Sequence, residues 1–219
     1  MQYRNTTKNP QKDMWYGVGS LWLIFSHDVI LDKSNVLYRT MHYDLTLNGV
    51  AAFENKQVYE ISFTCKRPGA YTTGFGYPAP RSAMGKIFID VESYAVLRFE
   101  VQIIRKPVTK KKWHGQVLDP YGTQLIQTYK EVEGKYFLNY SRQLHFGRYN
   151  YPQVAKSYDF LDMRELVSTE VMKSPVRNLT TSVMQIKTKS VVEDAAFWQS
   201  HNYQVEDNVR EAYKLMKRE

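Results

Sequence analysis

Apolar and polar residues alternate with a period of two along much of this chain, which is typical of β-strands with one buried face. The clearest example is residues 57–65, where Tyr59, Ile61, Phe63 and Cys65 fall on one face. The same alternation occurs in residues 42–47, 85–90, 96–103, 123–132 and 135–146. Later segments rich in β-branched residues, 164–172 and 180–189, predict further strands. The pattern therefore predicts a run of successive antiparallel strands.

Short polar segments separate these predicted strands. Residues 47–49 (LNG), 90–93 (DVES) and 133–135 (EGK) have compositions typical of turns, and the last predicts a tight hairpin at Gly134. Residues 66–84 contain several glycines and prolines, so we expect a long loop between two strands there.

The two ends of the chain differ from this pattern. Residues 1–13 are polar and predict a loose N-terminal segment, whereas the apolar residues 14–30 predict a buried helix or a turn and a helix. The C-terminal segment has an apolar stripe at helical spacing, formed by Val205, Val209, Ala212 and Leu215. No alternation of strands and helices is visible. We therefore expect a mainly β (α+β) fold, a curved antiparallel sheet or half-open β-barrel with helices at the start and C-terminus, with residues 14–219 as a single domain that ends in a helical tail.

Net charge and cysteine content exclude few binding partners and few kinds of site. The net charge is +8, and the densest basic run contains Lys110, Lys111 and Lys112. A solvated loop is the favoured interpretation of this run, and peripheral contact with an anionic membrane surface is the alternative. The lone Cys65 excludes a disulfide framework and a cysteine-rich zinc site, and its place on the inward face of a strand predicts a buried, unreactive thiol.

The sequence contains no motif that assigns a reaction. Residues 74–79 (GFGYPA) match the letters of a dinucleotide-binding turn, but the prolines and the strand that follow leave no room for the required helix. No two histidines have metal-ligand spacing, and no nucleophile elbow is present. We therefore expect no catalytic residues, no metal and no cofactor. A hydrolase that uses His114 and Asp119 is a distant alternative, and the absence of RNA-binding motifs argues against nucleic acid as a partner.

Four phrases in order carry a resemblance to a known family. They are residues 57–67 (QVYEISFTCKR), 84–101 (MGKIFIDVESYAVLRFEV), 129–146 (YKEVEGKYFLNYSRQLHF) and 193–203 (EDAAFWQSHNY). Together they resemble the C-terminal module of bacterial envelope proteins that have a carboxypeptidase-like regulatory domain. That module is similar to the half-open barrels of lipoprotein carriers. Members of the family begin with a signal peptide and a regulatory domain, neither of which is evident in this sequence, so we expect a piece of a longer protein or a divergent member.

The resemblance implies a location in the periplasm or at the outer membrane, and a non-enzymatic module with an apolar groove. Its ligand would be a lipid or an acyl chain. The residues expected to line the groove are Tyr59, Ile61, Phe63, Ile87, Ile89, Leu97, Phe99 and Val101. The alternative is a scaffold of the same fold with a filled core, which binds an envelope protein partner instead of a small ligand.

Overall fold

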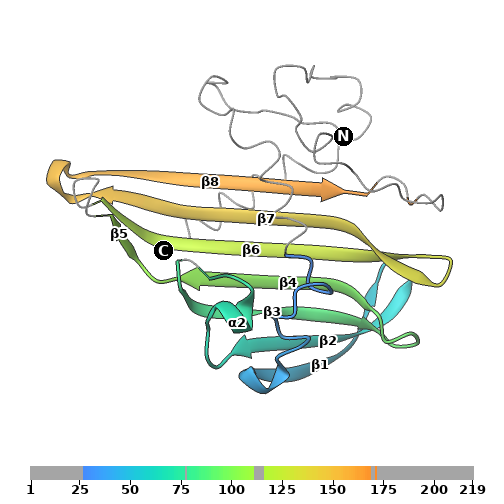
Figure 1. Cartoon of the computed structure of the whole chain (residues 1–219). Coiled ribbons are helices and arrows are strands. Elements are labelled where there is room, and N and C mark those ends of the chain that lie inside the picture. Colours follow the sequence, from blue (N-terminus) through green and yellow to red (C-terminus); the bar gives the residue numbers. More distant parts are fainter. Residues whose placement is uncertain (1–26, 77, 111–115, 169–170, 172–219) are drawn as a thin grey trace, which may run out of the picture. The chain divides into compact units, whose positions relative to one another are not determined.

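A single open antiparallel sheet of eight strands dominates the computed structural model (Figure 1). The structure describes residues 27–76, 78–110, 116–168 and 171. The strands are β1 (Tyr43–Phe53), β2 (Lys56–Cys65), β3 (Pro80–Asp90), β4 (Val96–Arg105), β5 (Val108–Lys110), β6 (Gln116–Val132), β7 (Lys135–Tyr151) and β8 (Lys156–Val167). The predicted mainly β fold with an antiparallel sheet is thereby confirmed.

Nearly every strand lies beside its neighbour in the sequence. The order across the sheet is β1-β2-β3-β4-β6-β7-β8, and the short β5 pairs with β6. The predicted hairpin at Gly134 is confirmed, because Glu133 and Gly134 have φ values of 52° and 73° between β6 and β7. Two successive positive φ angles suit the right-handed twist of paired strands, which explains the glycine. The predicted turn at residues 90–93 also joins two strands, β3 and β4.

Two turn and loop predictions were wrong in part. Residues 47–49 do not form a turn, because β1 continues through them with a register shift at Gly49, and the turn follows Phe53 instead. Gly49, with a φ of 133°, supplies the bulge that the alternation pattern did not reveal. The long loop predicted for residues 66–84 contains a short helix, α2 (Ala70–Thr73), and β3 already begins at Pro80.

Helices are scarce in the described part of the chain. Besides α2 there are two 3-10 turns, η1 (Thr40–His42) and η2 (Pro152–Val154). Three predicted elements lie outside the described residues. The helix predicted for residues 14–30 does so except for residues 27–30. The strand predicted for residues 180–189 and the apolar stripe from Val205 to Leu215 do so entirely. In the described ranges, no helix is long and apolar enough to cross a membrane.

One face of the sheet, here called the inner face, packs against α2 and the segment 27–42. Its buried apolar residues include Phe63, Ile87, Phe99 and Leu125 from four different strands. Gly85 is essential to this packing, because a Cβ atom there would lie 1.9 Å from the backbone oxygen of Glu100 and 2.7 Å from the ring of Phe63. The absence of a side chain at Gly85 leaves room for the Phe63 ring. This ring stacks with that of Phe99, with 5.6 Å between the ring centroids.

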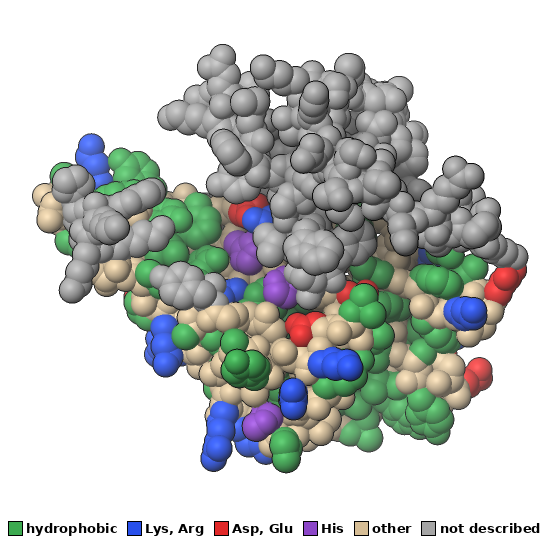
Figure 2. All heavy atoms as spheres, viewed as in Figure 1, with side chains coloured by type: hydrophobic (Ala, Val, Ile, Leu, Met, Phe, Trp, Pro, Cys, Tyr) green, Lys and Arg blue, Asp and Glu red, His purple; other side chains and the backbone are tan. Residues whose placement is uncertain are grey.

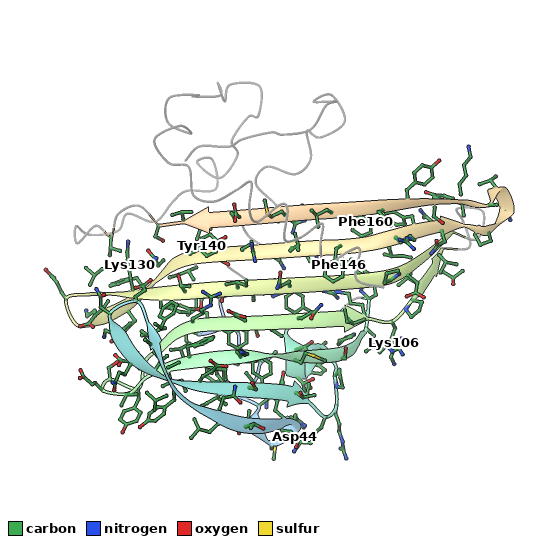
Figure 3. All side chains as sticks on the ribbon, turned by 180° about the vertical axis from the view of Figure 1, so that it is seen from behind. Asp44, Lys106, Lys130, Tyr140, Phe146 and Phe160 are labelled. Atoms are coloured by element: carbon green, nitrogen blue, oxygen red, sulfur yellow. The ribbon has the colours of Figure 1, made fainter. Side chains whose placement is uncertain are left out.

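Figure 3 shows the molecule from behind, with the side chains of the sheet as sticks. The face opposite the inner face carries ion pairs. Lys86 contacts Glu60 across two strands at 2.7 Å, and Arg98 contacts Glu100 along one strand at 2.5 Å. Both glutamates thus pair with a cation on this face, and such partly exposed ion pairs contribute little to stability.

At one end of the sheet, a single lysine joins three hairpins. The Lys56 ammonium donates to Asp90 at 2.8 Å, to Glu131 at 3.0 Å and to the hydroxyl of Tyr136 at 2.9 Å. These partners lie on β3, β6 and β7, whereas Lys56 begins β2. The hydrogen bond from Lys56, reinforced by one from Ser93, holds the pKa of Asp90 well below its ordinary value.

Candidate functional site

The row of residues predicted to line a ligand groove lies on strands β2, β3 and β4, in or against the core. Five of its members are buried: Phe63, Ile87, Leu97, Phe99 and Val101. The other three are partly buried: Tyr59, Ile61 and Ile89. Their predicted alternation is correct, because the cross-strand register places Ile61 beside Ile87 and Ile87 beside Phe99.

A segment of the chain itself covers this row. Val29 and Val36, which precede β1, and Phe75, which follows α2, belong to the same buried cluster as Phe63 and Phe99. A pocket that Val29 and Phe75 line together with Phe63 and Phe99 has a volume of about 10 Å³. A space of that size holds about one water molecule and is far too small for an acyl chain. A ligand groove along the whole row stays a prediction.

The covering segment is held down by buried hydrogen bonds to β6. The Tyr129 hydroxyl donates to Asp28 at 2.7 Å, and the amide of Val29 donates to the side-chain oxygen of Gln127 at 3.0 Å. Burial, and then the hydrogen bond to Asp28, raises the pKa of Tyr129, so that its hydroxyl remains a donor at all ordinary pH values. Asn35 adds a bond to the carbonyl of Val29 at 2.8 Å, which fixes the segment internally.

The inner face changes character toward β6, β7 and β8, where it becomes polar. Arg105 ends the inward row of β4 and is 4 % exposed. It donates to the hydroxyl oxygen of Thr123 from Nε at 3.2 Å and from Nη2 at 3.1 Å, and to the carbonyl of Pro78 at 3.0 Å. The rings of Phe75 and Tyr121 lie 5.1 and 5.2 Å from its guanidinium carbon. Aromatic faces and neutral oxygens thus surround this cation.

The hydrogen-bond pattern determines the state of His145. The oxygen of Thr123 accepts both Arg105 bonds, so its own hydrogen is left to donate to Nδ1 of His145, 2.9 Å away. Nδ1 is then an acceptor, and the neutral ring carries its hydrogen on Nε2. Burial lowers the pKa of His145 to about 3, and the charges of Arg164 and Arg105 lower it further in the same direction. The geometry and the electrostatics agree that this histidine is neutral.

Arg164 of β8 completes this polar area. Its Nη2 donates to Asp162 at 2.5 Å along the same strand, and the register places it opposite Gln143 of β7. The side chain of Arg164 is 13 % exposed, and its Nε and Nη1 atoms are buried without a hydrogen-bond partner. Figure 2 shows histidine, basic and acidic side chains gathered on this face of the molecule. We call Arg105, Thr123, His145 and Arg164 the Arg–His cluster.

No protein-family model, curated protein or solved structure matches this chain. The resemblance to envelope modules therefore stays a prediction, and the geometry of the inner face carries the functional argument.

No group of three or more histidine, cysteine, aspartate or glutamate side chains in the described ranges is arranged to hold a metal ion. Cys65 is buried, as predicted, next to the ring of Tyr43 in the core cluster. Gly74 and Gly76 precede strand β3 rather than a helix, which removes the geometry that a dinucleotide site requires.

Two other predicted features fall at the edge of the described chain. His114 lies outside the described residues, so its pairing with Asp119 stays untested, although Asp119 itself lies within β6 rather than in a loop. Lys110 ends β5, and Lys111 and Lys112 lie outside the described residues. Contact between these lysines and a membrane stays a prediction.

The Arg–His cluster was not foreseen from the sequence. Arg105 follows Leu97, Phe99, Val101 and Ile103 at alternate positions, so extending the apolar row by one step would have placed it on the inner face. His145 and Arg164 occupy inward positions of strands whose register could not be deduced without the hairpin geometry.

Proposed function

We propose that this chain is a non-enzymatic module of a bacterial cell envelope, a half-open barrel whose apolar face is filled by its own chain, and that it binds a protein partner. The supporting observation is the cover over the inner face. Val29, Val36 and Phe75 belong to the same buried cluster as Phe63 and Phe99, and the pocket that Val29 and Phe75 line there has a volume of about 10 Å³. This favours the scaffold alternative over a lipid groove.

The partner surface proposed is the outer edge of β1. This strand is terminal in the sheet order and pairs with β2 on one side. Its inward-facing residues extend past the covering segment, and Leu45, Leu47 and Val50 are 47 %, 62 % and 58 % exposed. An extended segment of a partner can add a strand to such an edge, with backbone hydrogen bonds supplying affinity and the exposed apolar side chains supplying specificity.

A lipid assay tests the filled core. The purified protein is extracted with organic solvent, the extract is examined by mass spectrometry, and a fluorescent fatty acid is titrated into the native protein. We expect no stoichiometric lipid and no saturable binding of the probe. Phe99→Glu should unfold the domain, because it places an unpaired charge in a packed core. Leu47→Glu is the matched control, since the same change at an exposed inward position should leave the fold intact.

Co-purified lipid that is lost in a folded Phe99→Glu variant would refute the proposal and restore the lipid groove. The partner surface has its own test, in which a photo-crosslinking residue replaces Leu47 in the native gene and, as a control, the exposed Tyr94 at another hairpin. A discrete crosslinked protein at position 47 alone, lost when Leu45→Lys is added, would support docking at β1. Equal crosslinking at both positions would contradict it.

The proposed location has a separate test. Fractionation of cells that express the complete native gene should recover the protein with the periplasm or the outer membrane. Recovery in the cytoplasmic fraction would contradict the envelope assignment without affecting the filled core.

A further inference from the structure

Buried positive charge in the Arg–His cluster is incompletely compensated. Arg105 is almost fully buried, and none of the described carboxylates forms an ion pair with it. Its partners are the neutral oxygens of Thr123 and Pro78 and two aromatic rings. A buried cation without a counter-ion is costly, so such a site attracts an anion.

Arg164 supplies hydrogen-bond donors that have no acceptor. One of its nitrogens is bonded to Asp162, while Nε and Nη1 are buried and unpartnered. The side-chain oxygen of Gln143, opposite Arg164, also lacks a partner, so a small rotation could satisfy one of these donors. At least one buried guanidinium N–H then still lacks an acceptor. In native proteins such groups are satisfied by water or by a bound ligand.

His145 adds a third donor. Because its Nδ1 accepts from Thr123, its Nε2 carries the hydrogen. The structure gives this nitrogen no hydrogen bond to any of the described residues. Among the described residues, Asp162 is paired with Arg164, and Asp32 raises the pKa of His27, which both arginines lower. Of the two guanidinium groups, only that of Arg164 forms an ion pair with a described carboxylate.

We propose that the Arg–His cluster binds a small oxyanion, a phosphate or carboxylate group, with Arg164 and the Nε2 hydrogen of His145 as direct donors. Arg105 contributes charge and holds His145 in its tautomer through Thr123. Solvent reaches the Asp162 side chain beside the cluster, since that side chain is 38 % exposed. Guanidinium groups suit this role because they remain charged when buried and offer several directed N–H donors to oxygen.

The test is titration of the purified protein with inorganic phosphate and, separately, with acetate, followed by NMR of the histidine ring and arginine Nε resonances. We expect saturable shifts at His145 and Arg164 for at least one anion. The pKa of His145 should rise on binding, because an anion beside the ring stabilises its protonated form. Arg164→Gln should weaken binding by about tenfold or more, as expected for a lost hydrogen bond to a charged group.

Arg98→Gln is the matched control. Arg98 also pairs with a carboxylate two residues away on its own strand, with the same 2.5 Å contact, but on the opposite face of the sheet. Anion binding should be unchanged in this variant. If Arg164→Gln does not fold, Arg164→Lys keeps the charge while removing Nε and Nη1, and should bind more weakly than the wild type.

Shifts with phosphate alone would assign a phosphate group, and shifts with acetate alone a carboxylate. No saturable shift with either anion would overturn the proposal and assign the unpartnered nitrogens to ordered water. Equal weakening in the Arg98 and Arg164 variants would also overturn it. These outcomes are independent of the proposed protein partner, since they concern neither β1 nor the filled core.

Discussion

The hydrogen bond between Tyr129 and Asp28 is the most direct handle on the closed inner face. Tyr129→Phe removes only the hydroxyl that donates to Asp28 at 2.7 Å, in a buried environment, and keeps the ring in the core cluster. A buried hydrogen bond to a charged acceptor contributes about 1.5–3 kcal/mol. We therefore expect the free energy of unfolding to fall by about that amount in Tyr129→Phe.

Urea unfolding followed by circular dichroism measures this change. With a slope of about 2 kcal/mol per molar urea, the midpoint should move down by about 1 M. Hydrogen exchange supplies a local readout, because the Val29 amide, bonded to Gln127, should lose protection more than amides in the centre of the sheet. Combining Tyr129→Phe with Asp28→Ala should cost less than the sum of the single changes, since each single change removes the same hydrogen bond.

Tyr94→Phe is the control for loss of a hydroxyl at an exposed site, and it should leave stability within about 0.5 kcal/mol of the wild type. A change below about 0.5 kcal/mol in Tyr129→Phe as well, with full additivity in the double variant, would refute the reasoning. The covering segment would then contribute nothing through this bond, and a closed inner face would no longer be supported by it.

Three further predictions follow from the core and the Lys56 network. Gly85→Ala should destabilise by about 1–3 kcal/mol in urea unfolding, since its Cβ would meet the Glu100 backbone. The pKa of Asp90 is held below its ordinary value of 3.8, so its contribution to the free energy of unfolding is full above about pH 4 and is lost as the pH falls. Asp90→Asn should therefore make the free energy of unfolding less dependent on pH in that range. Cys65 should resist a thiol reagent under native conditions and react after denaturation.

Each of these has an outcome that would count against it. Gly76→Ala is the control for Gly85, because its Cβ has only ordinary contact with Ala70 at 3.5 Å; equal losses in both variants would show that steric conflict is not the cause. If Asp90→Asn unfolds in acid at the same pH and as steeply as the wild type, the Lys56 network does not contribute to the pH dependence of stability. Rapid labelling of Cys65 in the folded protein would mean that its strand face is open to solvent.

Period-two alternation predicted strands within β1 to β4, β6 and β7, and the buried row of β2, β3 and β4. It missed β5 and most of β8, because the strand predicted at residues 164–172 overlaps only the last four residues of β8. It succeeds in β2, β3 and β4 because each of these strands has one face in a continuous apolar core, so Phe63 and Phe99 alternate with polar neighbours. It failed at residues 47–49, because Gly49 serves a bulge as readily as a turn and only the pairing with β2 distinguishes them.

The site was harder to predict than the fold, for a physical reason. The cover over the inner face depends on Val29 and Asp28 meeting residues of β6 about a hundred positions later, a separation of 98 residues for the bond from Val29 to Gln127. No local pattern encodes such a contact. Arginine is rarely buried, so the alternation pattern places a strand end at Arg105 and at Arg164. It gives no sign that the two side chains share one buried area.

The large sequence separation between Val29 and Gln127 has a consequence for folding during synthesis. Each strand of the sheet finds its partner soon after it leaves the ribosome, because neighbours in sequence are neighbours in space. The segment at Val29 emerges before β1, the first of the described strands, yet its anchors at Gln127 and Tyr129 are made only after β1 to β4. The nascent sheet therefore exposes Phe63 and Phe99 until β6 has been made, and this interval is when the chain is most open to aggregation or to a chaperone.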